Sequence, residues 1–116
     1  MKTVFFEVQE WEREDLQKNF PEAILTADKL DKEIASSYSD VEVASCFIYS
    51  QLNQEVIDKL PNLKFIATRS TGLDHIDLDY CKSKNIIIAN VPEYGSNTVA
   101  EHSFALILSL TRKIYQ

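Results

Sequence analysis

Short β-prone runs alternate with polar stretches of helical periodicity along most of the chain. The β-prone runs are rich in Val, Ile and Phe, and they predict strands at residues 4–8, 23–25, 43–49, 64–69 and 86–89. Helices are expected between them, at residues 11–19, 31–36, 54–60 and 78–84. Strands that alternate with helices are typical of α/β proteins. The pattern therefore predicts a flavodoxin-like open parallel five-stranded sheet with helices on both faces.

Three local features refine this prediction. The run from Val43 to Tyr49 is nearly continuous in small and β-prone residues, which is typical of a central strand covered on both faces. Asn53 is a candidate N-cap for the helix that follows it. Asp74 and Asp77 precede another predicted helix, and we interpret them as helix-start caps rather than catalytic acids.

The last segment of the chain predicts a long hydrophobic helix. Thr98 and Glu101 have the spacing of a capping box, so we expect the helix to begin there. The apolar residues between Phe104 and Leu110 cover most of the circumference, which is more than one sheet face could bury. No helix breaker precedes Gln116, so we expect the chain to be part of a longer protein.

Composition excludes several classes of function. The net charge is −6 and there is no basic run, which argues against a nucleic-acid partner and against an anionic membrane surface. The longest apolar stretch is far shorter than the about 20 residues of a membrane span. A charged residue interrupts the N-terminal apolar run before a signal peptide could form, so we expect a cytoplasmic protein without membrane association.

The cysteines and glycines limit the chemistry further. Cys46 and Cys81 lack metal-ligand spacing, so we expect no metal site and two free, buried thiols. Gly72 and Gly95 are the only glycines in the sequence. Both common phosphate-binding loops need several glycines, so a self-sufficient nucleotide site is excluded.

Three loops could carry a ligand site, because ligands of open α/β sheets gather beyond the carboxyl ends of the strands. They are residues 50–53, 70–75 and 90–96. In the second loop, Gly72 would let the backbone amides from Thr71 to Leu73 turn toward a small anion. The alternative is an ordinary strand-to-helix turn in which glycine supplies a positive φ.

Three side chains near these loops have two interpretations each. His75 beside the Gly72 loop, and His102 in the first turn of the long helix, could act as acid or base or make structural hydrogen bonds. Neither has an evident nucleophile or carboxylate partner in sequence. Tyr94 could direct its hydroxyl at a ligand or cover the edge of the sheet.

Three segments resemble one known family in order and spacing. They are FIATRSTGLDHID at residues 65–77, IANVPEY at 88–94 and SNTVAEH at 96–102. Together they are similar to the D-isomer-specific 2-hydroxyacid dehydrogenases. The similarity is strong from residue 60 onward and rests on the strand-helix pattern before that.

The resemblance implies an NAD-dependent oxidoreductase that interconverts a D-2-hydroxy acid and its 2-keto acid. In the family, the loop matching Thr71, Gly72 and Leu73 holds the substrate carboxylate through backbone amides. The segment matching Thr98 and Val99 approaches the nicotinamide side of the cofactor. Tyr94 matches a substrate-facing tyrosine of the D-lactate dehydrogenase-like branch, which implies a small 2-keto acid such as pyruvate.

The resemblance also implies a division of the chain. Residues 1–96 match the flavodoxin-like substrate domain, and residues 97–116 match a hinge and dimerisation helix leading to a dinucleotide-binding domain. The catalytic residues of the family lie beyond that helix, so no catalytic residue is assigned here, and His75, His102 and Glu101 do not match them. We expect the chain alone to be inactive and to form a homodimer through residues 98–115.

Two other classes of protein are compatible with the strand-helix pattern. A stand-alone flavodoxin-like binding or regulatory module would share the fold without catalysis. A receiver-like signalling domain would need acidic side chains clustered for a metal at the end of the first strand, and Glu7 and Glu10 imitate that cluster poorly.

Overall fold

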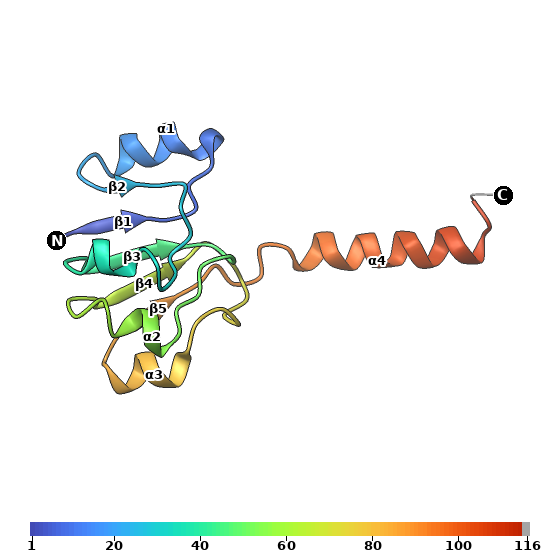
Figure 1. Cartoon of the computed structure of the whole chain (residues 1–116). Helices are drawn as coiled ribbons and strands as arrows, with labels where there is room; N and C mark the ends of the chain where they lie inside the picture. Colours follow the sequence, from blue (N-terminus) through green and yellow to red (C-terminus); the bar gives the residue numbers. More distant parts are fainter. Residues whose placement is uncertain (115–116) are drawn as a thin grey trace.

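A computed structural model describes residues 1–114 of the chain. All five strands are parallel, and their order across the sheet is β2-β1-β3-β4-β5 (Figure 1). The strands are β1 (Thr3–Phe5), β2 (Ile24–Leu25), β3 (Val43–Cys46), β4 (Phe65–Thr68) and β5 (Ile87–Ala89). The flavodoxin-like open sheet with β3 at its centre is therefore confirmed.

Helical segments connect the strands and follow the last one. They are α1 (Glu10–Asn19), the short 3₁₀ helix η1 (Ala35–Tyr38), α2 (Gln54–Ile57), α3 (Leu78–Ser83) and α4 (Ser96–Thr111). The predicted α-helix at residues 31–36 is wrong, because the helical turn there is the later 3₁₀ helix. The other elements are confirmed; most have shorter bounds, whereas α1 begins one residue earlier than predicted and α4 two residues earlier. The central strand ends at Cys46 because the following amides bond a side chain instead of a neighbouring strand.

The core lies on one face of the sheet. Val4, Ala44 and Ile66 lie side by side in neighbouring strands, and all three are fully buried. The side chains that cover them come from η1, α2, α3 and the adjoining turns, and include Leu30, Ala35, Val56, Ile57, Leu60 and Cys81. Their burial is the main stabilising contribution of the fold.

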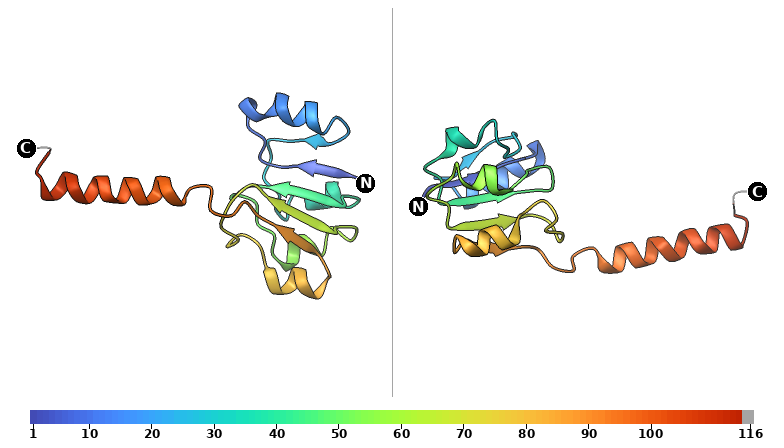
Figure 2. Two further views of the ribbon diagram at one scale, coloured as in Figure 1. Left: turned by 180° about the vertical axis from the view of Figure 1, so that it is seen from behind. Right: turned by 60° about the horizontal axis from the view of Figure 1, so that its bottom comes forward.

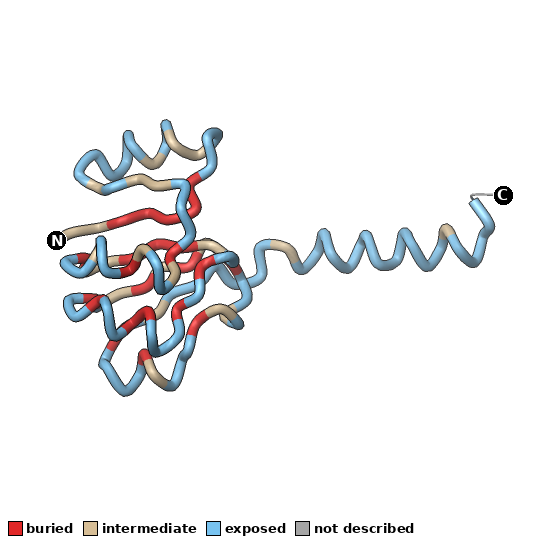
Figure 3. The backbone as a smooth tube through the Cα atoms, in the orientation of Figure 1, coloured by how far each residue is buried: buried red, intermediate tan, exposed pale blue. Residues whose placement is uncertain are grey.

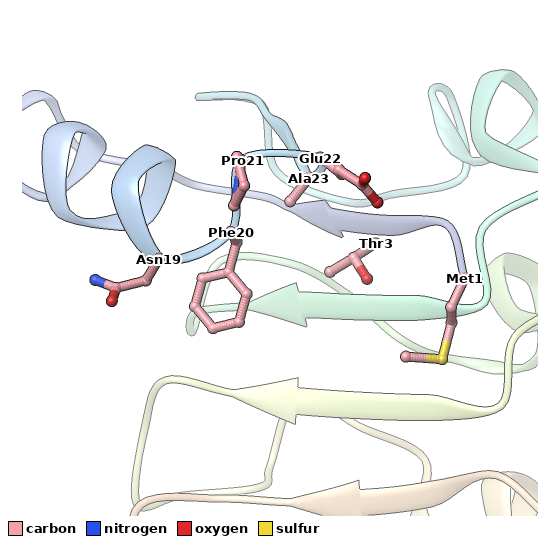
Figure 4. A pocket seen from close by; sticks show the side chains of 7 residues that line it. All are labelled: Met1, Thr3, Asn19, Phe20, Pro21, Glu22 and Ala23. Atoms are coloured by element: carbon pink, nitrogen blue, oxygen red, sulfur yellow. The ribbon is translucent and has the colours of Figure 1, made fainter.

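The opposite face of the sheet is only partly covered. Phe20, at the end of α1, packs on Phe5 with their ring centroids 5.1 Å apart. Figure 4 shows the ring of Phe20 on the same side of the sheet as Thr3 and Met1. These four residues also line an apolar pocket of about 620 Å³, which extends over β3 and β4 to Val43, Ser45, Phe65 and Ala67. Helices thus lie on both faces, but α1 leaves much of its face open.

The helix ends test the predicted caps. Asn53 accepts the amide of Val56 at 3.1 Å and Asp77 accepts the amide of Tyr80 at 2.9 Å, so both predicted caps are confirmed. Among the described residues Asp74 caps no helix, so that predicted cap is wrong. The predicted capping box at Thr98 and Glu101 is wrong, because α4 begins two residues earlier, after Gly95, without a side-chain cap. Nothing in Ser96 or Asn97 opposes helical backbone, so Thr98 lies inside the helix.

Helix α4 projects away from the rest of the molecule (Figures 1 and 2). It is exposed along almost its whole length (Figure 3). Its apolar side chains remain more than half exposed, and they include Val99, Phe104, Leu106, Ile107, Leu108 and Leu110. The long hydrophobic helix is therefore confirmed, and within residues 1–114 it packs on no other element. The end of the predicted dimerisation segment lies outside the described residues.

Helix length and hydropathy also bear on membrane insertion. Over residues 1–114, every helix is too short or too polar to cross a bilayer.

Candidate functional site

Two loops meet at the carboxyl edge of the sheet, where the sequence predicts a ligand site. One follows β4 and contains Gly72, and the other follows β5 and leads into α4. The amide of Val91 in the second loop donates to the carbonyl oxygen of Ser70 in the first, at 3.0 Å. The hydroxyl of Thr71 donates back to the carbonyl oxygen of Val91 at 2.8 Å. The loops are therefore held side by side.

The backbone amides of Thr71, Gly72 and Leu73 have no hydrogen-bond partner among residues 1–114. Thr71 and Gly72 are exposed and Leu73 is half-buried. Backbone N–H groups without a partner carry a partial positive charge, so they can attract a carboxylate or phosphate.

Gly72 has no positive φ, so the alternative of a turn that needs glycine for its conformation is wrong. A Cβ built on Gly72 would meet only the Asp74 carboxylate, at an ordinary contact distance of 3.5 Å. Neither the backbone nor the packing of the described residues therefore requires glycine here. Its missing side chain instead leaves open the space beside the free amides.

A surface cleft of about 510 Å³ opens beside this loop. It brings together Thr71, Tyr94 and Val99, three of the residues singled out in the sequence, with Glu93, Gly95, Ser96 and Ala100. Gly72 and Leu73 adjoin the cleft through Thr71 but do not line it, and neither does Thr98. Tyr94 is 69% exposed, so it does not cover the sheet edge as a packed side chain.

The two histidines have different surroundings. The Nε2 atom of His75 lies 3.1 Å from the hydroxyl oxygen of Thr68, which is buried. Burial lowers the pKa of His75, while the charges of Glu7 and Asp74 oppose that shift. His102 lies in the second turn of α4, not the first, and is exposed. The structure therefore gives His75 a hydrogen-bonded position under the Gly72 loop and leaves His102 outside the site.

Sequence reasoning missed the role of Glu7 at the same edge of the sheet. Its carboxylate is buried and accepts the amides of Phe47, Tyr49 and Ser50 at 3.1, 3.0 and 2.9 Å. Its backbone is left-handed, with a φ of 57°. The sequence carried one sign of this arrangement, a charged residue inside the apolar run that ends at Val8.

Arg69 is a second missed residue. Its guanidinium donates to the carbonyl oxygens of Phe6 and Glu7 at 2.9 and 3.1 Å, and it pairs with Glu12 at 3.3 Å. Its charge is therefore engaged within the protein and directed toward the end of β1, not toward the amides of Thr71, Gly72 and Leu73.

Both cysteines are free and buried, as predicted. Burial and the nearby charge of Glu7 raise the pKa of Cys46 to about 12. Burial also raises the pKa of Cys81. Within residues 1–114 no group of three metal-ligating side chains comes together.

Comparison with known families identifies the class of this chain. Residues 3–115 match the family model described as D-isomer specific 2-hydroxyacid dehydrogenase, catalytic domain. The chain belongs to this family, which consists of oxidoreductases.

Particular relatives show how the match is distributed. A D-lactate dehydrogenase of Staphylococcus aureus is 32% identical over 118 residues, covering 97% of this chain and 36% of the relative. A glyoxylate reductase of Thermofilum pendens is 34% identical over 85 residues, covering 73% of this chain and 25% of the relative. The chain thus spans about a third or less of the length of these relatives.

A solved structure shares the fold closely. The crystal structure of D-lactate dehydrogenase from Aquifex aeolicus, complexed with NAD and lactic acid, superposes with a TM-score of 0.86 at 37% identity. The superposition covers 94% of this chain and 33% of that one.

Proposed function

We propose that this chain is the substrate-binding part of an NAD-dependent enzyme that interconverts a D-2-hydroxy acid and its 2-keto acid. The free amides of Thr71, Gly72 and Leu73 carry this proposal, because they offer a carboxylate three donors at the edge of an open cleft. The D-lactate dehydrogenases among its relatives support the substrate class.

The cleft suggests how the rest of a small acid would lie. With its carboxylate on the amides, the acid would extend over Thr71 toward Tyr94 and Val99, which line the same cleft. The Tyr94 hydroxyl is an exposed donor and acceptor that can orient the oxygen at carbon 2. We therefore propose a short 2-keto acid such as pyruvate as the substrate.

The cofactor needs residues that these 116 do not supply. A dinucleotide-binding turn uses several glycines, and the whole sequence has only Gly72 and Gly95. We propose that NAD, which supplies hydride transfer when bound, is held mainly by a domain outside this chain. Thr98 and Val99, in the first turn of α4, would then approach its nicotinamide side. Residues 1–96 would correspondingly be the substrate domain, and residues 97–116, which contain most of α4, would be the hinge segment.

We also propose that the chain forms a homodimer through residues 98–115. The apolar side chains of α4 have no partner within residues 1–114 and surround most of the helix. Burying them between two copies would remove a large apolar area from water.

A titration followed by ¹⁵N NMR tests the anion site on the chain itself. Oxamate, an analogue of pyruvate, should shift the amide resonances of Thr71, Gly72 and Leu73, with smaller shifts at Tyr94 and Val99. Oxamide has nearly the same shape but no charge, so it should shift them little. Equal shifts with both compounds, or shifts located elsewhere, would overturn the proposal.

A further inference from the structure

The carbonyl oxygens of the three peptide groups around Gly72 are all engaged in hydrogen bonds. The carbonyl oxygens of Ser70, Thr71 and Gly72 each accept a hydrogen bond, from Val91, Asn90 and Ser70 respectively. In a trans peptide the carbonyl of one residue and the N–H of the next point in opposite directions, and residues 1–114 contain no cis peptide. Each of these hydrogen bonds therefore also fixes the direction of the amide in the same peptide group, at Thr71, Gly72 and Leu73 respectively.

Two of the three carbonyls are held by side chains. The backbone amide of Val91 holds the first, and most residue types at position 91 would provide it. The side-chain amide of Asn90 donates to the carbonyl oxygen of Thr71 at 2.8 Å. The hydroxyl of Ser70 donates to the carbonyl oxygen of Gly72, also at 2.8 Å. The directions of the Gly72 and Leu73 amides thus depend on the chemical identity of residues 90 and 70.

The hydroxyl of Ser70 is itself oriented by Thr68 and His75. A hydroxyl has one proton, and that of Ser70 goes to the Gly72 carbonyl, so Ser70 must accept from Thr68, whose oxygen lies 2.7 Å away. Thr68 must then accept from Nε2–H of His75 at 3.1 Å. Ser70 and Thr68 are both buried. The hydrogen bonds therefore run in one direction, from His75 to Thr68, from Thr68 to Ser70 and from Ser70 to the carbonyl oxygen of Gly72.

We propose that Ser70 and Asn90 are positioning residues that hold the amides of the Gly72 loop in their anion-binding orientation. The inference rests on the proposed function for its ligand, but the hold on the loop is a property of the chain itself. Asn90 is exposed and its hydrogen bond joins two surface loops. Removing the Asn90 side chain should therefore mainly reduce local order in the loop, since a solvent-exposed polar contact adds little to global stability.

Alanine variants of both residues, compared with matched controls, test the proposal. Asn90→Ala and Ser70→Ala each remove one side-chain donor to a carbonyl of the loop. Asn62→Ala and Ser83→Ala each remove a donor to a carbonyl elsewhere, from Asn62 to Ser39 at 3.3 Å and from Ser83 to Tyr80 at 2.7 Å. Backbone ¹⁵N relaxation, oxamate affinity and thermal unfolding are measured on all five proteins.

The expected result is a local loss of order. In the parent and both controls, the backbone order parameters of residues 71–73 should be about 0.85. In Asn90→Ala and Ser70→Ala they should fall below about 0.6. Oxamate should bind each of these two variants about fivefold more weakly, the usual contribution of one neutral hydrogen bond. The melting temperature of Asn90→Ala should stay at the parent value, so the proposal remains testable even if Ser70→Ala fails to fold.

Two failures can be told apart. The first is a parent that does not bind oxamate but whose ordered loop becomes disordered in the two variants. In that case the anion-binding function is wrong and the positioning role of Ser70 and Asn90 is retained. If order and oxamate affinity in Asn90→Ala equal those of the parent, the positioning role is overturned while the proposed function survives.

Discussion

The carboxylate of Glu7 accepts the backbone amide of Ser50 at 2.9 Å across 43 residues of sequence. The Ser50 hydroxyl donates to the same carboxylate oxygen and accepts the amide of Leu30 at 2.9 Å. One buried side chain at the end of β1 thereby fixes the loop after β3, which leads into α2. The sheet, the Phe47–Ser50 loop and the turn before η1 are joined at this point.

Replacing Glu7 should therefore destabilise the fold. Glu7→Gln keeps the shape but turns an amide NH₂ toward backbone donors, so we expect a loss of about 2 kcal/mol in the free energy of unfolding, typical of hydrogen bonds to a charged group. Urea unfolding measures the change. Glu93→Gln is a suitable control, because Glu93 has a similar φ of 59° but is exposed. Similar losses in the two variants would contradict the assigned role of Glu7.

Gly72→Ala should separate folding from binding. The residue has no positive φ and its added methyl group would contact only Asp74, so the fold should tolerate alanine and gain about 0.4–1 kcal/mol from a less flexible unfolded chain. The methyl group would stand beside the free amides and hinder the close approach of an anion. We expect oxamate to bind more than about tenfold more weakly, a cost of at least about 1.4 kcal/mol. Unchanged affinity with an intact fold would show that the amides are not the binding site.

Local patterns predicted most of the fold. The open parallel sheet followed from the alternation of strands and helices, and the central place of β3 followed from its small, β-prone residues. The Asn53 and Asp77 caps followed from single residues before apolar runs. Errors occurred where distant residues decide the outcome. The third strand was predicted three residues too long because Glu7, about 40 positions away, takes the amides that would have continued it.

The candidate site was also predictable only in part, because the sheet topology places some of its residues and contacts between distant residues place the others. Thr71, Tyr94 and Val99 come together because the carboxyl ends of parallel strands share one edge of the sheet. The contact of Asn90 with Thr71 spans 19 positions and leaves no local signal. The start of α4 was predicted wrongly from the capping-box residue types at Thr98 and Glu101. Ser96 and Asn97 before them also accept helical backbone, so the helix begins at Ser96.

Neither thiol should react in the native protein. Cys46 and Cys81 have no exposed surface, and the pKa of Cys46 is raised to about 12. At pH 8 we expect slow reaction with a disulfide reagent, followed by release of two equivalents of thiol product in denaturant. Cys46→Ser and Cys81→Ser assign each equivalent. Rapid reaction of Cys46 in the folded chain would contradict its burial and show that the surrounding structure opens readily.

Acidification should weaken the fold through His75. Burial holds its pKa in the folded chain below the ordinary value of 6.5, so the folded state binds this proton less well than the unfolded state does. The stability contributed by neutral His75 is present above pH 6.5 and declines as the pH falls through and below that value. Urea unfolding at pH 7.5 and 5.5 should show a larger loss for the parent than for His75→Gln, which keeps a donor for Thr68 but does not titrate. An equal loss in both proteins would remove His75 from this pH dependence.

Charges placed on α4 should abolish self-association without unfolding the sheet. Phe104 and Leu108 lie one turn apart on the helix, are 66% and 55% exposed, and have no partner within residues 1–114. Sedimentation velocity of the parent should show a particle of twice the 13.3 kDa chain mass, and Phe104→Lys/Leu108→Lys should sediment as a monomer because two charges cannot be buried at an apolar interface. Gln17→Lys/Asn62→Lys adds the same charge at exposed positions of the sheet domain and should remain a dimer. A parent that is monomeric at about millimolar concentration, where even an affinity worth only about 4 kcal/mol would be visible, would leave α4 without a role in self-association.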